Sequence, residues 1–241
     1  MSVLTLAKKT LYGVKLPRTV VRKGTRCGVV AGDNLTALYD TFIKGVSIDE
    51  KLDLLDSNYT EYAPLFVVDK SATVRAKVAQ LSVAYHDILH EDISADVRLS
   101  VAQYGDNTYL EQLAQDTDQF VRLAVARKTT KYFEDMLDDP YWLVRLEIAE
   151  YSDMYHDYLH TDSSEDVRVC IAEYSDEYHD IYVDDESWIV RLAVARFSDK
   201  YHDILRNDDD SDVRKTVRNW PLIHNTPTDV VKNMGIGGFY G

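Results

Sequence analysis

Two consecutive stretches of 23 residues decide the fold: DSSEDVRVCIAEYSDEYHDIYVD at residues 162–184 and DESWIVRLAVARFSDKYHDILRN at residues 185–207. They share an opening Asp, a Val-Arg pair, an apolar residue four positions after that Val, an Ala next to it and a Tyr-His-Asp run. A fixed period of this length is the sequence signature of a repeat protein, in which each unit is one small supersecondary structure.

The Val-Arg pair marks seven units along the chain. It recurs at spacings of 23, 24, 23, 23, 23 and 23 residues, at Val74-Arg75, Val97-Arg98, Val121-Arg122, Val144-Arg145, Val167-Arg168, Val190-Arg191 and Val213-Arg214. A worn copy is expected before them, starting near Lys51. The positions that still fit the pattern there are Leu55, Tyr62, Leu65 and Asp69. We therefore expect seven to eight units of about 23 residues.

Each unit is expected to hold two helices. Apolar residues fall at the Val and again four, five and seven positions later, which places them on one face of an α-helix. After a turn, a Tyr and a Leu four residues apart, such as Tyr155 and Leu159, share one face of a shorter helix. Because neither helix is long enough to be stable alone, the units have to stack. The expected fold is all-α, an α-solenoid of two-helix repeats.

A second column of the repeat is as regular as the Val-Arg pair. An Asp precedes the Arg of each of the seven units by six positions, in the turn before that helix. An Asp and an Arg placed in this way can pair, and in a stack such pairs form a ladder of charge-assisted hydrogen bonds. The expected ladder is Asp69, Arg75, Asp92, Arg98, Asp116, Arg122, Asp139, Arg145, Asp162, Arg168, Asp185, Arg191, Asp208 and Arg214. A row of catalytic or ligand-binding carboxylates is the alternative meaning of this column.

The pattern D-x4-V-R-x2-V-A-x-Y-S-D-x-Y-H-D-x-L, over residues 50–220, resembles the bacterial leucine-rich repeat variant family and also resembles HEAT repeats. The first resemblance implies an α-helix alternating with a shorter, often 3₁₀, helix. The second implies an Asp–Arg ladder. One type of leucine-rich repeat variant protein carries a Cys-ligated iron–sulfur cluster near its N-terminus, but this chain has only Cys27 there, so no cluster is expected.

Charge is divided unevenly along the chain. The whole chain has 27 Lys and Arg against 41 Asp and Glu, a net charge of −14, whereas residues 1–32 hold seven basic residues and no acid. The remainder therefore carries a net charge of −21, and with seven Asp and seven Arg committed to the ladder it keeps 34 acids and 13 bases. This excess of acids argues against a nucleic-acid binder and indicates a protein partner with a basic surface.

Aromatic and acidic residues in the repeat columns are the candidates for contact with a partner. The Tyr column that includes Tyr155, Tyr178 and Tyr201 either packs between units or lines a binding groove. Trp142 and Trp188 hold one position two units apart, and they either cap a turn or act as exposed anchors. The candidate partner-binding residues are Tyr141, Trp142, Trp188, Tyr155, Tyr178, Tyr201, Asp184, Glu186, Asp209 and Asp210.

No catalytic, cofactor or metal site is expected from the motifs. The chain has no GxGxxG, Walker A, GxSxG or HExxH sequence. His86 and His156 each have a second His four residues on, a spacing that can chelate zinc on a helix. The same column holds Leu110 and Phe133, which favours a half-exposed position over metal binding.

We therefore expect three segments: a basic N-terminal cap or arm at residues 1–45, acidic α-solenoid repeats at 46–220, and a flexible glycine-containing tail at 221–241. The expected function is a non-catalytic protein-interaction module, a cytoplasmic scaffold or adaptor that binds neither nucleic acid nor membrane. The alternative is a DNA-mimic inhibitor of a nucleic-acid-binding protein, a class that is often virus-encoded. That alternative requires the free acids to gather on one face. A HEAT-like DNA-repair glycosylase is a third, less favoured function, because its concave face would be basic.

Overall fold

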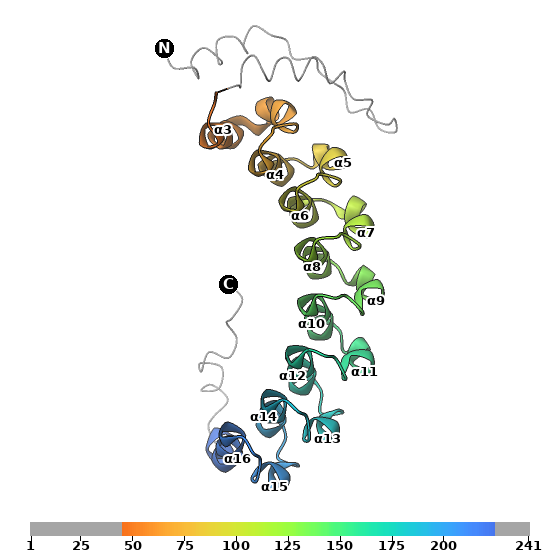
Figure 1. Cartoon of the computed structure of the whole chain (residues 1–241), viewed down its shortest axis with the longest axis vertical. Coiled ribbons are helices and arrows are strands. Elements are labelled where there is room, and N and C mark those ends of the chain that lie inside the picture. Colours follow the sequence, from red (N-terminus) through yellow and green to blue (C-terminus); the bar gives the residue numbers. More distant parts are fainter. Residues whose placement is uncertain (1–44, 225–241) are drawn as a thin grey trace. The chain divides into compact units, whose positions relative to one another are not determined.

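The computed structural model describes residues 45–224, and all regular secondary structure within that range is helical. The basic segment at residues 1–32 and residues 225–241 of the expected tail lie outside the described residues, whereas residues 221–224 of that tail are helical. The chain divides into two compact units between Lys128 and Thr129, and each is a stack of two-helix repeats (Figure 1). The expected all-α repeat fold is confirmed.

From residue 45 onward, the first compact unit contains four long helices and the short segments between them. Its elements are α3 (Ile48–Phe66), α4 (Ala72–Leu81), η1 (Val83–Tyr85), α5 (His86–Leu89), α6 (Ala95–Tyr104), η2 (Asn107–Tyr109), α7 (Leu110–Leu113) and α8 (Gln119–Lys128). Helices α3, α4, α6 and α8 pack in sequence as one layer, and the short helices form a second layer beside them (Figure 1). Helix α3 is the worn first copy, and it contains a kink at Asn58.

The second compact unit repeats the same arrangement. Its elements are η3 (Thr130–Tyr132), α9 (Phe133–Met136), α10 (Trp142–Tyr151), η4 (Asp153–Tyr155), α11 (His156–Leu159), α12 (Glu165–Tyr174), α13 (His179–Tyr182), α14 (Trp188–Phe197), α15 (His202–Leu205) and α16 (Ser211–His224). Helices α10, α12, α14 and α16 form the long layer. The second segment of several repeats is a 3₁₀ turn followed by one turn of α-helix, as the resemblance implies.

The core of each repeat comes from the apolar column that begins at the Val. In α12, Val167 and Ile171 are fully buried and Ala172 is 1% exposed. The position seven residues after the Val was expected on this same buried face, and that expectation is wrong at Tyr174, which is 64% exposed. The reason is that this residue ends the long helix, so its ring projects beyond the core.

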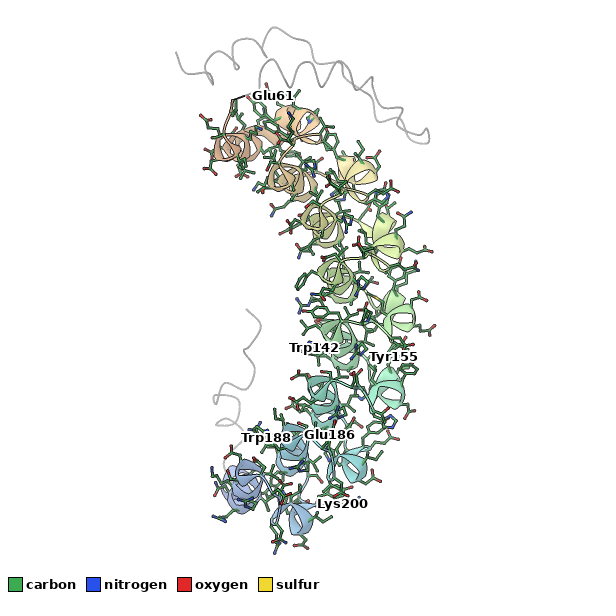
Figure 2. The ribbon with its side chains drawn as sticks, viewed as in Figure 1. Glu61, Trp142, Tyr155, Glu186, Trp188 and Lys200 are labelled. Atoms are coloured by element: carbon green, nitrogen blue, oxygen red, sulfur yellow. The ribbon has the colours of Figure 1, made fainter. Side chains whose placement is uncertain are left out.

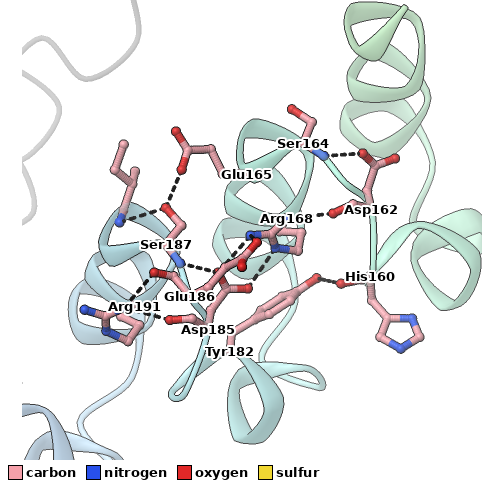
Figure 3. A network of polar contacts seen from close by, with 11 residues as sticks. His160, Asp162, Ser164, Glu165, Arg168, Tyr182, Asp185, Glu186, Ser187 and Arg191 are labelled. Carbon is pink, nitrogen blue, oxygen red and sulfur yellow. Dashed lines mark hydrogen bonds and ion pairs between the residues drawn. The ribbon is translucent and has the colours of Figure 1, made fainter. Parts of the chain in front are cut away.

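The ladder joins neighbouring repeats, but its side-chain pairing differs from the expected one. Arg168 donates from Nε and Nη2 to the two carboxylate oxygens of Asp185, 17 residues later, at 2.8 Å each (Figure 3). Its Nη1 donates to the main-chain carbonyl of Asp162, six residues earlier, at 2.7 Å. The carboxylate thus binds the Arg of the preceding repeat, while the carbonyl of the same Asp accepts from the Arg six positions later.

This pairing recurs within both compact units. Bidentate pairs join Arg75 to Asp92, Arg98 to Asp116, Arg145 to Asp162 and Arg191 to Asp208. In the worn copy, Lys51 takes the place of the Arg and donates from Nζ to Asp69 at 2.9 Å. The bond from Arg Nη1 to the carbonyl six residues earlier also forms at Arg122 and Arg214.

Each ladder Asp also shapes the turn that starts its own long helix. Asp162 accepts from the amide N–H of Ser164 at 2.7 Å, and Asp185 accepts from the amide of Ser187 at 2.8 Å (Figure 3). A carboxylate that accepts the N–H two residues on closes an Asx turn. This bond aims the carboxylate back at the preceding repeat, which explains why it does not meet the Arg six positions later.

Replacing Asp185 with Asn is expected to destabilise the protein far more than replacing its neighbour Asp184 with Asn. Asn keeps the Asx turn but removes the charge facing Arg168, which is only 7% exposed. Loss of one partner of a buried ion pair costs about 3–5 kcal/mol, and this pair, which is still slightly exposed, should lie near the lower end. Asp184 is exposed, so its change should stay within about 0.5 kcal/mol. Urea unfolding followed by circular dichroism measures both, and equal midpoints would contradict the ladder's role.

Candidate functional site

Four of the candidate partner-binding residues are exposed at the amino ends of α14 and α16. Trp188 is the first residue of α14 and is 41% exposed, and Glu186 lies in the turn before it (Figure 2). Glu186 and Asp184 are both exposed in that turn. Asp209 is exposed in the turn before α16. We call Trp188, Asp184, Glu186 and Asp209 the turn-edge cluster.

The ladder separates two kinds of acid within these turns. The side chains of Asp185 and Asp208 are 9% and 5% exposed and are bound to Arg, whereas their neighbours Asp184 and Asp209 face solvent. Glu186 approaches Arg168 only to 3.8 Å, with its side chain 90% exposed, so that contact contributes little. The turn-edge cluster therefore presents exposed acids in two consecutive turns, together with an exposed indole ring.

Three other candidates take part in local packing and capping. Tyr141 and Trp142 are half-buried and meet edge to face, with their ring centroids 6.5 Å apart. Asp210 accepts from the amide N–H groups of Asp212 and Val213 at 2.7 and 3.2 Å, which caps the start of α16. These three side chains offer less accessible surface than the turn-edge cluster.

The Tyr column packs between repeats. Tyr178 and Tyr201 are buried and Tyr155 is half-buried. Tyr178 stacks on His160 with ring centroids 5.0 Å apart, and its hydroxyl donates to Asp157 at 2.7 Å. Burial, together with that hydrogen bond, raises the pKa of Tyr178 to about 12. Of the two meanings that the sequence left open for this column, the geometry supports packing.

The His column is mostly buried, so the expected half-exposed position is wrong at His86, His156 and His179, while His202 is half-buried. His86, His156 and His179 are at most 3% exposed, and each Nε2 lies 2.7–2.8 Å from the carbonyl oxygen of an Ala seven residues earlier. These carbonyls lie in the last turn of a long helix, where no intrahelical amide is available to them. The imidazole therefore closes the end of the long helix. Within residues 45–224, no group of three or more His, Cys, Asp or Glu is placed to hold a metal.

Lys128 is a polar residue whose part the sequence did not reveal. In the preceding repeat the His column holds Leu110, which cannot bind the carbonyl of Ala102. The Lys128 ammonium donates instead to that carbonyl at 2.9 Å, to that of Gln103 at 3.2 Å and to that of Gly105. Desolvation lowers the pKa of Lys128. One feature of the sequence could have indicated this role: Lys128 stands in a repeat column that otherwise holds mostly aromatic residues.

Exposed acids lie on both layers of the second compact unit. The short segments carry Asp153, Asp157, Asp176, Glu177, Asp180, Asp199 and Asp203, and the long helices carry Glu150, Glu165, Asp166, Glu173 and Asp212. The long helices also carry the exposed bases Arg196, Lys215 and Arg218. The gathering of acids on one face that a DNA mimic needs is therefore incomplete.

Comparison with known proteins supports the fold. No family model matches the chain, and no curated protein matches it. It is similar to a solved structure described as a leucine-rich repeat variant with a novel repetitive protein structural motif, at a TM-score of 0.65 and 23% identity. The match covers 77% of this chain and 82% of that one. Among the described helices, none is both long and apolar enough to cross a bilayer.

The ladder predicts how stability depends on pH. Burial by itself would raise the pKa of Asp92, Asp116 and Asp208, but hydrogen bonds from Arg and from backbone amides outweigh it, so each pKa falls below its ordinary value of 3.8. A folded-state pKa below the unfolded one means that the stabilisation is complete above about pH 4 and is lost as the pH falls through the folded value. Urea midpoints should decline below about pH 4, and less steeply in Asp208→Asn. Identical slopes in the two proteins would contradict the assignment.

The thiol of Cys170 is expected to be unreactive in the folded protein. Burial in α12, reinforced by Glu150 and Glu173, raises its pKa to about 12, so almost no thiolate forms at pH 8. In a Cys27→Ser variant, a chromogenic disulfide reagent should detect no thiol under native conditions and one thiol in denaturant. Rapid native labelling would show that the repeat opens at α12.

Proposed function

The chain has the fold of a leucine-rich repeat variant, and on that premise we propose that it is a non-catalytic protein-interaction module. It is an acidic scaffold that binds a protein with a basic surface. A fold alone does not determine a function, so the proposal depends on the surface that the repeats present.

The turn-edge cluster is the observation that carries this proposal. Trp188, Asp184, Glu186 and Asp209 are exposed in two consecutive turns, while the ladder acids of the same turns are bound to Arg. An indole ring supplies apolar contact area and can stack with a Lys or Arg of a partner. The surrounding carboxylates attract basic surfaces and accelerate their association.

The ladder supports the proposal because it holds the turns that carry the turn-edge cluster in fixed positions. The bidentate bonds of Arg168 and Arg191 hold the turns on either side of α14. A surface held in this way loses little conformational entropy when a partner binds, which increases affinity. The buried Arg, Asp and His side chains of the described repeats are engaged in packing and capping. That engagement favours a scaffold over an enzyme.

The test compares capture of a partner by matched variants of the full-length chain. The immobilised protein is exposed to extract from its native source, and bound proteins are quantified at several salt concentrations. Trp188→Ala, and separately Asp184→Asn with Glu186→Gln, should each weaken retention of the partner at least tenfold, because hot-spot residues contribute about 2 kcal/mol or more. Thermal unfolding verifies that each variant is folded.

The matched controls change an equal number of exposed groups in the first compact unit. They are Tyr59→Ala for the aromatic ring and Asp96→Asn with Glu111→Gln for the charges, all at exposed positions. Partner retention should be unchanged in these controls. An equal loss in controls and test variants would refute the turn-edge cluster as the binding surface. Release of the partner by competing DNA would instead favour mimicry of a polyanion.

A further inference from the structure

A row of exposed aromatic rings lies at the carboxyl ends of three long helices. Tyr151, Tyr174 and Phe197 are the last residues of α10, α12 and α14, and they are 64%, 64% and 52% exposed. They occupy the same position of three consecutive repeats. We call them the carboxyl-edge aromatics. These side chains take no part in the Asp–Arg ladder or in the buried core. Packing within the stack therefore does not explain why they recur regularly.

The stacking of the long helices sets the spacing of this row. Helix α12 packs directly against α10 on one side and α14 on the other (Figure 1). Helices in direct contact lie about 8–10 Å apart, so the row offers one ring at about that interval. A ligand that contacts all three rings needs a repeat of the same length along its own axis.

The charge around the rings specifies a cationic ligand. Glu150 and Glu173 precede the two Tyr residues, and an Asp follows each of the three rings by two positions, all with exposed side chains (Asp153, Asp176 and Asp199). One exposed base, Arg196, precedes Phe197, so the acids around the row outnumber the bases. The carboxyl end of an α-helix adds negative partial charge from its last carbonyls. The first compact unit shows the same chemistry directly, because there the carboxyl end of α6 binds the ammonium of Lys128 through three carbonyls.

We propose that the carboxyl-edge aromatics bind a proline-rich, basic segment of a partner protein in the polyproline II conformation. That helix has three residues per turn and rises 3.1 Å per residue, so a Pro at every third position recurs at about 9 Å, within the spacing of the long helices. Aromatic surfaces bind such segments without a large loss of ligand entropy. Lys or Arg at the intervening positions meets the carboxylates beside each ring.

The other regular conformations fit this row less well. A β-strand returns a side chain to the same face after about 6.7 Å, and an α-helix completes a turn in 5.4 Å. Neither distance, nor the length of about 10.8 Å for two α-helical turns, falls within an interval of about 8–10 Å. The ligand class therefore follows from the period of the repeat together with its charge.

The inference rests on the proposed interaction function and adds a second surface to it. Trp188 and Phe197 stand at opposite ends of α14, a helix of 10 residues. At 1.5 Å per residue they are separated by about 13 Å along the axis. Variants at one end therefore leave the other end unchanged, and the two surfaces can be tested independently.

The experiment measures binding of synthetic peptides to the full-length chain by fluorescence anisotropy. The probe is a labelled peptide of four Pro-Pro-Lys repeats, and the matched peptide of four Gly-Ser-Lys repeats has the same charge without the polyproline II preference. The Pro-Pro-Lys peptide should bind at least tenfold more tightly. Tyr174→Ala should weaken its binding at least fivefold, and Glu173→Gln should weaken it less and reduce its salt dependence.

Two controls decide the outcome. Trp188→Ala removes an exposed ring at the other end of the helices, and Ile181→Ala removes an exposed apolar residue of the short layer. Both should bind the Pro-Pro-Lys peptide as the unaltered protein does. Equal affinity for the two peptides, no measurable binding, or a loss in Trp188→Ala but not in Tyr174→Ala would each overturn the inference. Capture of the natural partner through Trp188 would stand after any failure of this peptide experiment.

Discussion

The bidentate bond between the Arg of one repeat and the Asp of the next is the interaction on which the described structure depends. At Asp185, a single carboxylate accepts both guanidinium bonds of Arg168 and the amide of Ser187, so it docks two repeats and starts a long helix at once. The geometry of Arg suits this role, because its planar fork binds both oxygens of a carboxylate. In the worn first copy, Lys51 takes the place of the Arg and donates a hydrogen bond from Nζ to Asp69.

The ladder also determines which groups remain for recognition. It withdraws Asp185 and Asp208 from the surface and leaves the turn-edge cluster exposed around Trp188. Imidazoles, or Lys128 in one repeat, close the opposite ends of several long helices, beside the column that holds the carboxyl-edge aromatics. The turn-edge cluster and the carboxyl-edge aromatics therefore both lie beside side chains that cap the ends of long helices. Both recur with the period of the repeat. For the interaction function that we propose, this period is what a partner would match.

Several features of the site escaped prediction for one reason: spacing along the chain does not reveal which neighbour a side chain meets across the stack. The Asp column was expected to pair with the Arg six residues later, yet its carboxylate turns back to the preceding repeat. Leu110 in the His column was interpreted as a sign of exposure. The structure shows that an apolar residue replaces a buried imidazole there, and that Lys128 supplies the missing hydrogen bond.

The period, the two-helix unit and the ladder residues follow from the sequence alone, because local helix patterning and a recurring Asp and Arg repeat identically in each unit. The direction of each ion pair, the burial of His179 and the exposure of Tyr174 were decided only by the tertiary structure. Each of these depends on what the neighbouring repeat covers. A helical pattern places a side chain on a face, whereas its burial and its hydrogen-bond partner are settled only when the next repeat packs against it.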